Sequence, residues 1–256
     1  MSFVLGEVHA IRKREPGLIA EDNFATGMCN WTQLINGNVP AGVVYLDSEI
    51  THESPYSLIL GTGSQPSWGE GTQGYAASFK RLSRGPSVGK VYMHWKFAYG
   101  SVLGTNYPRN VDFGLDQCDP DGERRFFKIR WLNYDETAGA RVSKFQVNGD
   151  PSSTWIDVPG AAVDLGYNEN KRNLWDVEAI FDVEAGLYDG LRVNGLGFGS
   201  LAPVPDNALR SLSGPHPHML AQFKSGMNCG IEVYNRLQVA GTPAWVNLAY
   251  FKAVAL

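Results

Sequence analysis

The stretch 111–131 constrains the fold more than any other part of the chain, because it places a turn between two alternating segments. The turn is DPDG, at residues 119–122, in which proline has the φ that a type I turn needs and glycine tolerates a left-handed conformation. A three-residue loop with a bulge at Gly122 predicts that Asp119 lies opposite Glu123. The stretch is therefore predicted to be an antiparallel hairpin.

Counting back from the turn assigns the hairpin side chains to two faces, because successive strand residues point to opposite sides. Asp112 is predicted opposite Arg130 and Gly114 opposite Lys128, with Asp116 one pair further along. One face is therefore polar and charged, and the other is expected to be core. The predicted core face consists of Val111, Phe113, Leu115, Phe127, Ile129 and Trp131.

Short alternating segments recur along the 256 residues, separated by Gly, Pro, Asn and Asp. Many short strands with regular turn signals predict an all-β fold, and at this length two antiparallel sheets packed as a β-sandwich are the natural solution. No composition shift marks a boundary, so we expect a single domain over 1–256, with 1–20 as an N-terminal arm and 203–218 as a long loop. The predicted strands lie within 54–63, 74–85, 88–100, 141–149, 173–198, 230–239 and 244–256.

Charge and hydropathy exclude several classes of function. The net charge is −4 without a basic block, so no nucleic-acid partner is expected. No apolar stretch is long enough to span a bilayer, so no membrane association is expected. The first residues lack the apolar core of a signal peptide, which predicts a cytoplasmic protein. Three scattered cysteines predict neither a disulfide framework nor a zinc site. The sequence indicates no particular oligomeric state.

Several motifs together resemble a bacterial domain family of unknown function: LIAEDNFATGMCNWTQL, YSLIL, KIRWLNY and WIDVPGAAVDLGYNENKRNLWDVEAIFDVEAGLYDGLRVNG. They also resemble the concanavalin A-like lectin/glucanase fold, a jelly roll, over most of 18–256. The resemblance implies a curved β-sandwich and, by analogy, a link to carbohydrates. Glucanases of that fold carry an alternating E-x-D-x-E motif. Here the nearest analogue is Asp112-x-Gly114-x-Asp116, which departs from that motif at its centre, and fold alone does not give function.

The polar face of the hairpin is the first candidate site. If the strand at 91–99 pairs alongside it, Tyr92, His94 and Lys96 join the same surface as the hairpin residues. His94 and Asp112 are the candidate catalytic residues, since imidazole titrates near neutral pH and glycoside hydrolysis uses carboxyl groups. Alternatively, Asp112 is simply ion-paired across the strands and His94 hydrogen-bonded to a neighbour. The candidate ligand-binding residues on this surface are Tyr92, Lys96, Asp116, Lys128 and Arg130.

The spacing of the acids limits a glycosidase hypothesis. Retaining enzymes hold two carboxyl groups about 5–5.5 Å apart and inverting enzymes about 6.5–9.5 Å apart. Four residues along one strand separate Asp112 from Asp116 by about 13 Å. A catalytic pair therefore requires a carboxylate from another strand, such as Glu178 or Glu232.

Two loops suggest further contacts. Trp68 lies in a Gly/Ser/Gln-rich loop at 61–75, where it either stacks on a sugar ring or folds back over the sandwich edge. Asp116, Asp119 and Asp121 partly match a calcium loop, but the downstream glutamate is missing at the required spacing. Acidic residues of a turn explain that cluster equally well. We therefore assign no metal ligand and no cofactor, with calcium as the one open alternative.

Three hypotheses for function follow. The first is a carbohydrate-active enzyme, a glycoside hydrolase or lyase acting on a glycoside. The second is a non-catalytic carbohydrate-binding protein that uses Trp68 and the polar face. The third is a structural or assembly subunit that contacts another protein. A converging acid pair in a groove favours the first, whereas a broad apolar patch favours the third.

Overall fold

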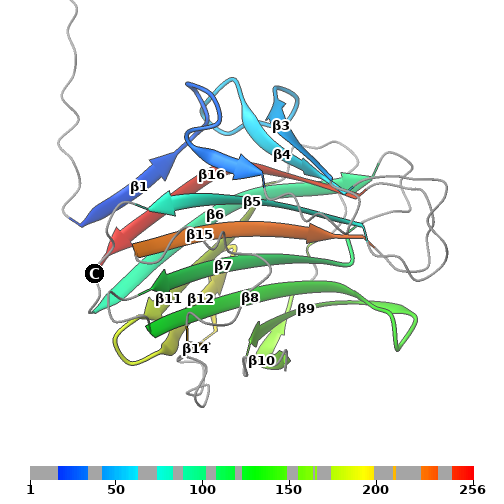
Figure 1. The fold of residues 1–256 in the computed structure, drawn as a ribbon. Helices are drawn as coiled ribbons and strands as arrows, with labels where there is room; N and C mark the ends of the chain where they lie inside the picture. The colour runs from blue at the N-terminus through cyan, green and yellow to red at the C-terminus, as the bar shows by residue number, and fades with distance from the viewer. Residues whose placement is uncertain are drawn as a thin grey trace, which may run out of the picture.

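The structure is a computed structural model, and it describes residues 17–33, 42–62, 74–82, 89–101, 108–118, 123–148, 155–163, 165, 174–198, 210–211, 226–235 and 244–256. Within these ranges the regular elements are all β-strands, and they form two antiparallel sheets (Figure 1). The predicted fold class is confirmed.

Sheet A has eight strands in the order β13-β12-β11-β6-β16-β4-β3, with β1 also paired to β16. Its strands are β1 (Leu18–Asp22), β3 (Val43–Asp47), β4 (Ser57–Gly61), β6 (Lys90–Ser101), β11 (Trp175–Asp182), β12 (Leu187–Val193), β13 (Leu196–Phe198) and β16 (Ala244–Ala255).

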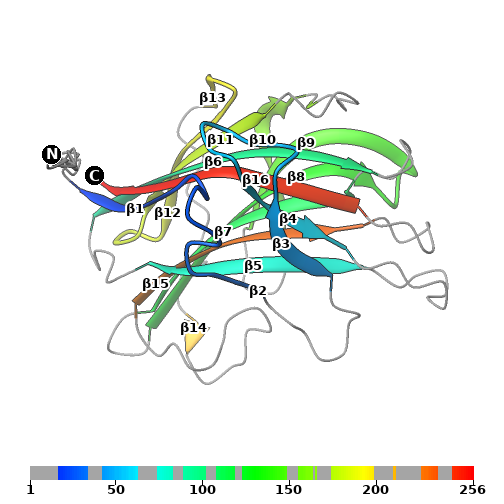
Figure 2. The same ribbon diagram turned by 90° about the horizontal axis from the view of Figure 1, so that it is seen from above.

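Sheet B also has eight strands, in the order β10-β9-β8-β7-β15-β5-β2, with β14 paired to β8. Its strands are β2 (Trp31–Gln33), β5 (Tyr75–Leu82), β7 (Asn110–Cys118), β8 (Glu123–Asp135), β9 (Ala140–Asn148), β10 (Trp155–Ala162), β14 (Arg210–Ser211) and β15 (Gly226–Tyr234). Seen from above, β6, β11 and β16 lie in one layer and β5, β7 and β15 in the other (Figure 2).

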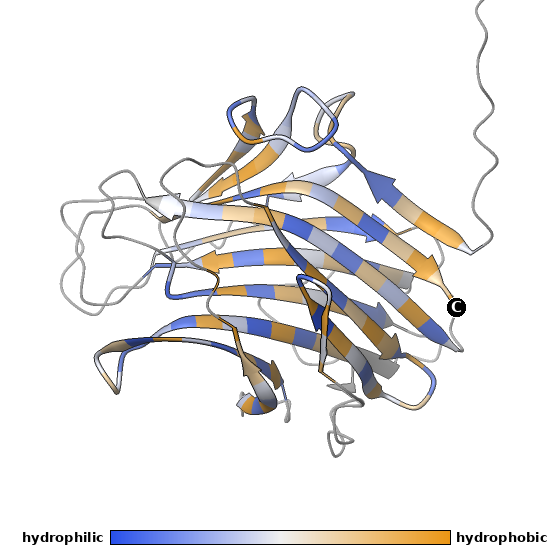
Figure 3. Cartoon of the chain, turned by 180° about the vertical axis from the view of Figure 1, so that it is seen from behind, coloured by the Kyte–Doolittle hydropathy of each residue, from blue (hydrophilic) through white to orange (hydrophobic). Residues whose placement is uncertain are grey.

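The hairpin of β7 and β8 has the predicted register. Asp112 pairs with Arg130, and Gly114 pairs with Lys128. The turn itself, at 119–122, lies outside the described residues. Polar and apolar residues alternate along the strands (Figure 3), and the predicted apolar ladder is part of the hydrophobic core. Local turn chemistry and period-two alternation were therefore sufficient to fix this register.

The expectation that the strand at 91–99 pairs alongside the hairpin is wrong. That strand is β6, which pairs with β11 and β16 in the other sheet. Its apolar face packs against the hairpin across the sandwich: the Trp95 and Phe97 rings lie 5.4 and 5.2 Å from the ring of Phe113. When the two sheets face each other, the apolar face of β6 and that of the hairpin bury one another. If β6 paired beside the hairpin, both apolar faces would still be exposed to solvent.

Two other predicted segments are described only in part. Leu18–Ala20, at the end of the expected N-terminal arm, belong to β1, while 1–16 lie outside the described residues. Of the expected loop at 203–218, only Arg210–Ser211 are described, and they form β14. That the whole of 1–256 is one domain stays a prediction. In the described part of the chain no helix is long and apolar enough to cross a membrane.

Candidate functional site

The outer face of sheet B carries a group of buried charges. Asp112 on β7, Lys128 and Arg130 on β8, and Glu232 on β15 point away from the core, and we call these four residues the charged network. Asp112 is fully buried, with 0% of its surface exposed, and Glu232 is nearly so. Buried charges are tolerated only when they are paired, so the contacts between these residues decide what the face can do.

The contacts pair every member of the charged network. Arg130 donates from Nε to Oδ1 of Asp112 at 2.8 Å and from Nη2 to Oδ2 at 2.9 Å, a two-pronged contact that fixes the guanidinium plane. Lys128 Nζ lies 2.7 Å from Glu232 and 3.2 Å from Asp112, so it bridges the two carboxylates. Asn110 donates a further hydrogen bond to Asp112 at 2.6 Å.

The glycine that departs from the glucanase motif has a structural role in this network. Lys128 lies opposite Gly114 on β7, yet its ammonium reaches Glu232 on β15, one strand further. Gly114 itself pairs with Gly230 of β15. Two glycines thus lie side by side where the lysine crosses, and neither presents a side chain to it. A motif with an acid at the centre would place a carboxylate there instead.

The pairing sets the ionisation of the network. Burial raises the pKa of the Asp112 carboxyl, but the nearby cations Arg130 and Lys128 lower it by a larger amount. The resulting pKa is about 2. Burial lowers the pKa of Lys128, while Glu232 and Asp112 raise it to above its usual value. The pKa of Arg130 is raised in the same way, by Asp112 against the effect of burial. These three groups are therefore charged at every pH from 4 to 9.

Aromatic rings flank the charged network. On one side, the guanidinium of Arg130 lies 3.6 Å from the centroid of the partly exposed Trp155 ring on β10. On the other side, Tyr75, Phe79 and Tyr234 form a cluster that we call the aromatic patch. The rings of Tyr75 and Tyr234 are 4.9 Å apart, and Tyr234 donates a hydrogen bond to Glu232 at 2.6 Å. Burial and the nearby Glu232 raise the pKa of Tyr234 well above its usual value, so its hydroxyl remains a donor.

The outer face of sheet A carries a different group of polar residues. His94 Nε2 and Asp176 Oδ1 are 2.5 Å apart, and both side chains are partly exposed. Lys96 Nζ lies 3.8 Å from Asp176 and 3.2 Å from Nε2 of His52. Burial raises the pKa of Asp176, but the hydrogen bond to His94 and the charge of Lys96 lower it below its usual range. This histidine is oriented by a carboxylate, as in a general-base pair.

The predicted site residues therefore do not share one surface. Asp112, Asp116, Lys128 and Arg130 lie on the outer face of sheet B, with Asp116 buried beyond the glycine pair. The other three, Tyr92, His94 and Lys96, lie on the outer face of sheet A. The two candidate catalytic residues are on opposite sides of the sandwich, because β6 and β7 pack face to face.

Two expectations fall on residues that are not described. Trp68 and residues 63–73 of its loop lie outside the described ranges, and so do Asp119 and Asp121 of the possible calcium loop. Among the residues that are described, no cluster of three or more His, Cys, Asp or Glu side chains has the arrangement of a metal site.

Sequence reasoning missed Asp176, Trp155 and Tyr234. Alternation in WDVEAIFD already places Asp176 on the polar face of its strand, and alternation in GIEVY places Tyr234 on the same face as Glu232. What was missing is the strand order, which places β10 beside β9, β15 beside β7, and β11 beside β6.

The fold resembles that of several solved structures. The conserved carbohydrate esterase of Shiga toxin-encoding bacteriophage phi24B is similar over 93% of this chain and 98% of its own, with a TM-score of 0.50 and 8% identity. Cellulose-induced protein Cip1 is similar over 93% of this chain and 97% of its own, with a TM-score of 0.48 and 16% identity. An endo-β-1,4-glucuronan lyase from the fungus Trichoderma reesei is similar over 93% of this chain and 96% of its own, with a TM-score of 0.49 and 8% identity.

The likeness to the esterase, which has a TM-score of 0.50, is one of fold, and that fold is the two-sheet antiparallel sandwich described above. Two of the three proteins are named as enzymes that act on carbohydrates. No family model matches the chain, and no curated protein is similar to it in sequence. The uncharacterised bacterial family therefore stays a resemblance.

Proposed function

We propose that the protein binds a neutral carbohydrate chain on the outer face of sheet B. The observation that carries this proposal is the stack of Arg130 on Trp155, with Asp112 holding the guanidinium in place from below. A fixed planar donor beside a partly exposed indole ring offers a sugar both a hydrogen-bond donor and an apolar surface. Because Asp112 already orients the arginine, little side-chain entropy is lost on binding.

The aromatic patch extends this surface across the sheet. Tyr234 and Phe79 are partly exposed, whereas Tyr75 is buried. The Phe79 ring lies on Gly230, where a Cβ atom would be only 2.4 Å from its Cε1. The ring thus occupies the space that a side chain at position 230 would need. Trp155, the charged network and the aromatic patch together span the sheet from β10 to β5, which suits a chain of several sugar units.

Charge compensation supports a neutral ligand. The network contains two carboxylates and two cations, each paired within 3.2 Å. A uronic-acid polymer requires cations that are not already neutralised, whereas hydroxyl groups require fixed donors and acceptors.

Ionisation supports binding over hydrolysis at this face. A glycosidase needs one carboxyl group that is protonated near neutral pH. With a pKa of about 2, Asp112 does not supply that proton, and its complete burial removes it from direct contact with a ligand. We therefore assign Asp112 a positioning role, in which it acts through Arg130 and Lys128.

Removing the indole ring is expected to weaken glycan binding. Trp155→Ala should lower the affinity for a neutral polysaccharide about tenfold, or about 1.4 kcal/mol. Isothermal titration calorimetry with soluble xyloglucan, mixed-linkage β-glucan and galactomannan measures the affinity. Thermal shift provides a second readout, since ligand at about ten times Kd stabilises the fold by about 1.4 kcal/mol.

The matched control is Tyr45→Ala, which removes an aromatic ring that is 51% exposed on the edge strand β3 of the other sheet. This variant should bind like the unaltered chain. Alginate serves as the acidic comparison and should bind more weakly than the neutral polymers. If no polymer produces a heat of binding, or if Trp155→Ala and Tyr45→Ala lose affinity equally, binding at this face is refuted.

The His94–Asp176 pair supports a second candidate, an enzyme that uses the outer face of sheet A. A partly exposed imidazole held by a carboxylate is the arrangement of a general base in a hydrolase or lyase. On this hypothesis His94→Ala abolishes turnover of a nitrophenyl glycoside panel, and Trp155→Ala leaves it unchanged. Turnover that persists in His94→Ala, or none in the unaltered chain, rejects this candidate.

A further inference from the structure

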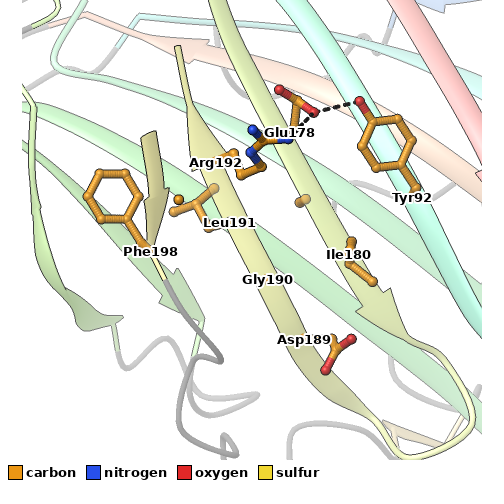
Figure 4. Close-up of a pocket in the computed structure, with 10 residues that line it drawn as sticks. Tyr92, Glu178, Ile180, Asp189, Gly190, Leu191, Arg192 and Phe198 are labelled. Atoms are coloured by element: carbon orange, nitrogen blue, oxygen red, sulfur yellow. Dashed lines mark hydrogen bonds and ion pairs between the residues drawn. The ribbon is translucent and has the colours of Figure 1, made fainter. Parts of the chain in front are cut away.

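A pocket of about 260 Å³ opens on sheet A where β11, β12 and β13 lie side by side. It lies on the opposite side of the sandwich from the charged network. Ile180 and Gly190 lie at its middle, with Glu178 and Arg192 toward one end and Asp189 toward the other (Figure 4). Pockets for drug-sized ligands usually measure about 300–1,000 Å³, so this smaller space suits a single ring.

Two glycines keep this pocket open. A Cβ atom at Gly197 would meet no atom within 4 Å, and at Gly190 it would meet only Cδ1 of Ile180, at 3.9 Å. Neither glycine has a left-handed φ, so the backbone here accepts other residues. Neither backbone conformation nor crowding therefore requires glycine at these two positions. Their effect is to expose a flat backbone surface beside an aliphatic side chain.

A carboxylate and an aromatic hydroxyl border that surface. Tyr92 donates a hydrogen bond from its hydroxyl to Oε2 of Glu178 at 2.8 Å, and Arg192 Nη1 lies 3.9 Å from the same oxygen (Figure 4). Burial and the carboxylate raise the pKa of Tyr92, so it stays protonated as a donor. Both contacts are made to Oε2, and together they orient the carboxyl group of Glu178.

We propose that this pocket binds a single pyranose ring, such as the end of a glycan. The apolar C–H face of the ring lies on Ile180 and the glycine backbone, while hydroxyl groups donate to Glu178 and accept from Arg192. A ring of this kind has donors around its whole edge, which matches carboxylates at both ends of the pocket. The site is independent of the one proposed on sheet B, and either exists without the other.

The charges at both ends favour an uncharged ligand. Arg192 approaches Glu178, and Lys90 contacts Asp189 at 2.7 Å. Each carboxylate thus has a cation beside it, and the pocket has no excess charge to select an ammonium or a carboxylate ligand. A pocket with an apolar middle and polar groups at its rim matches a sugar ring, which has apolar C–H faces and hydroxyl groups around its edge.

Filling the pocket tests the proposal. Methyl glucoside, methyl galactoside, methyl mannoside and N-acetylglucosamine are titrated into ¹⁵N-labelled protein, and amide shifts are followed by NMR. One of these sugars is expected to shift the amides of Gly190 and Gly197, with a Kd on the order of 1 mM. Gly197→Val should weaken this binding about tenfold or more, since its side chain enters the space that the ring needs.

Two further variants make the result decisive. Glu178→Gln keeps the pocket volume but removes the charge, and it should weaken binding as well. Leu196 is the exposed neighbour of Gly197 and does not itself line the pocket, so Leu196→Val should leave binding unaltered. Trp155→Ala should also have no effect, which separates this site from the one on sheet B. No shift with any sugar, or shifts that survive Gly197→Val, would overturn the proposal.

Discussion

Lys128→Met is expected to destabilise the fold by about 3–5 kcal/mol, because it leaves two carboxylates buried without their shared cation. The ammonium lies 2.7 Å from Glu232 and 3.2 Å from Asp112, and the lysine side chain is only 7% exposed. Methionine retains most of the volume, so the loss comes from charge and hydrogen bonding, with only a small contribution from a cavity. Urea denaturation followed by tryptophan fluorescence measures the change in unfolding free energy.

Lys144→Met is the matched control. Lys144 belongs to the same sheet and contacts Asp157 at 2.8 Å, nearly the same distance, but its side chain is 28% exposed and that of Asp157 is 59% exposed. Water screens such a pair, so the expected cost is about 0–1 kcal/mol. If both substitutions cost the same, the difference in burial does not determine the energetics of the charged network, and Lys128 is not the link between its carboxylates.

Acid is expected to remove the stabilisation that Asp112 provides. Its pKa is about 2 in the folded chain and 3.8 in the reference state, so the unfolded chain binds more protons between these values. Stability therefore rises with pH in this window, is fully present above about pH 4, and is lost as the pH falls toward 2. The shift corresponds to about 2 kcal/mol. Unfolding free energies measured between pH 2 and 7 give the size of this acid limb.

Asp112→Asn isolates the contribution of this one carboxyl group. The variant should be less stable at pH 7, since Arg130 and Lys128 lose a buried partner. Its stability should also change less between pH 4 and 2 than that of the unaltered chain, because the titrating group is gone. An acid limb of the same size in both proteins would show that other carboxylates account for it.

Local patterns were enough to predict the strands, because alternation and turn residues act over a few positions. The pairing of Asp112 with Arg130 followed from the DPDG turn and the alternation of the strands beside it. The same reasoning extended to β6 failed, since alternation tells which face of a strand is apolar but not which sheet the strand joins. Trp95 and Phe113 are equally apolar in either arrangement, and only burial across the sandwich distinguishes them.

The site was predictable only as far as the hairpin reaches. Glu232 completes the charged network from β15, more than a hundred residues along the chain from Lys128, and the sequence offered it as one of two possible partners. Trp155 reaches Arg130 from β10. These contacts depend on the order of strands within sheet B, which is set by packing of the entire sandwich. The pairing of His94 with Asp176 depends in the same way on the order within sheet A.

The central place of β16 in sheet A has a consequence for synthesis of the chain. β16 follows every other described strand in sequence, yet it lies between β6 and β4 and also pairs with β1 (Figure 1). Until it leaves the ribosome, β6 has an unpaired edge and β1 has no strand to join. Sheet A is thus completed only after translation of its last strand, and earlier strands must wait with apolar faces uncovered. Exposed apolar surface and unpaired strand edges are the features that make a folding chain prone to aggregation.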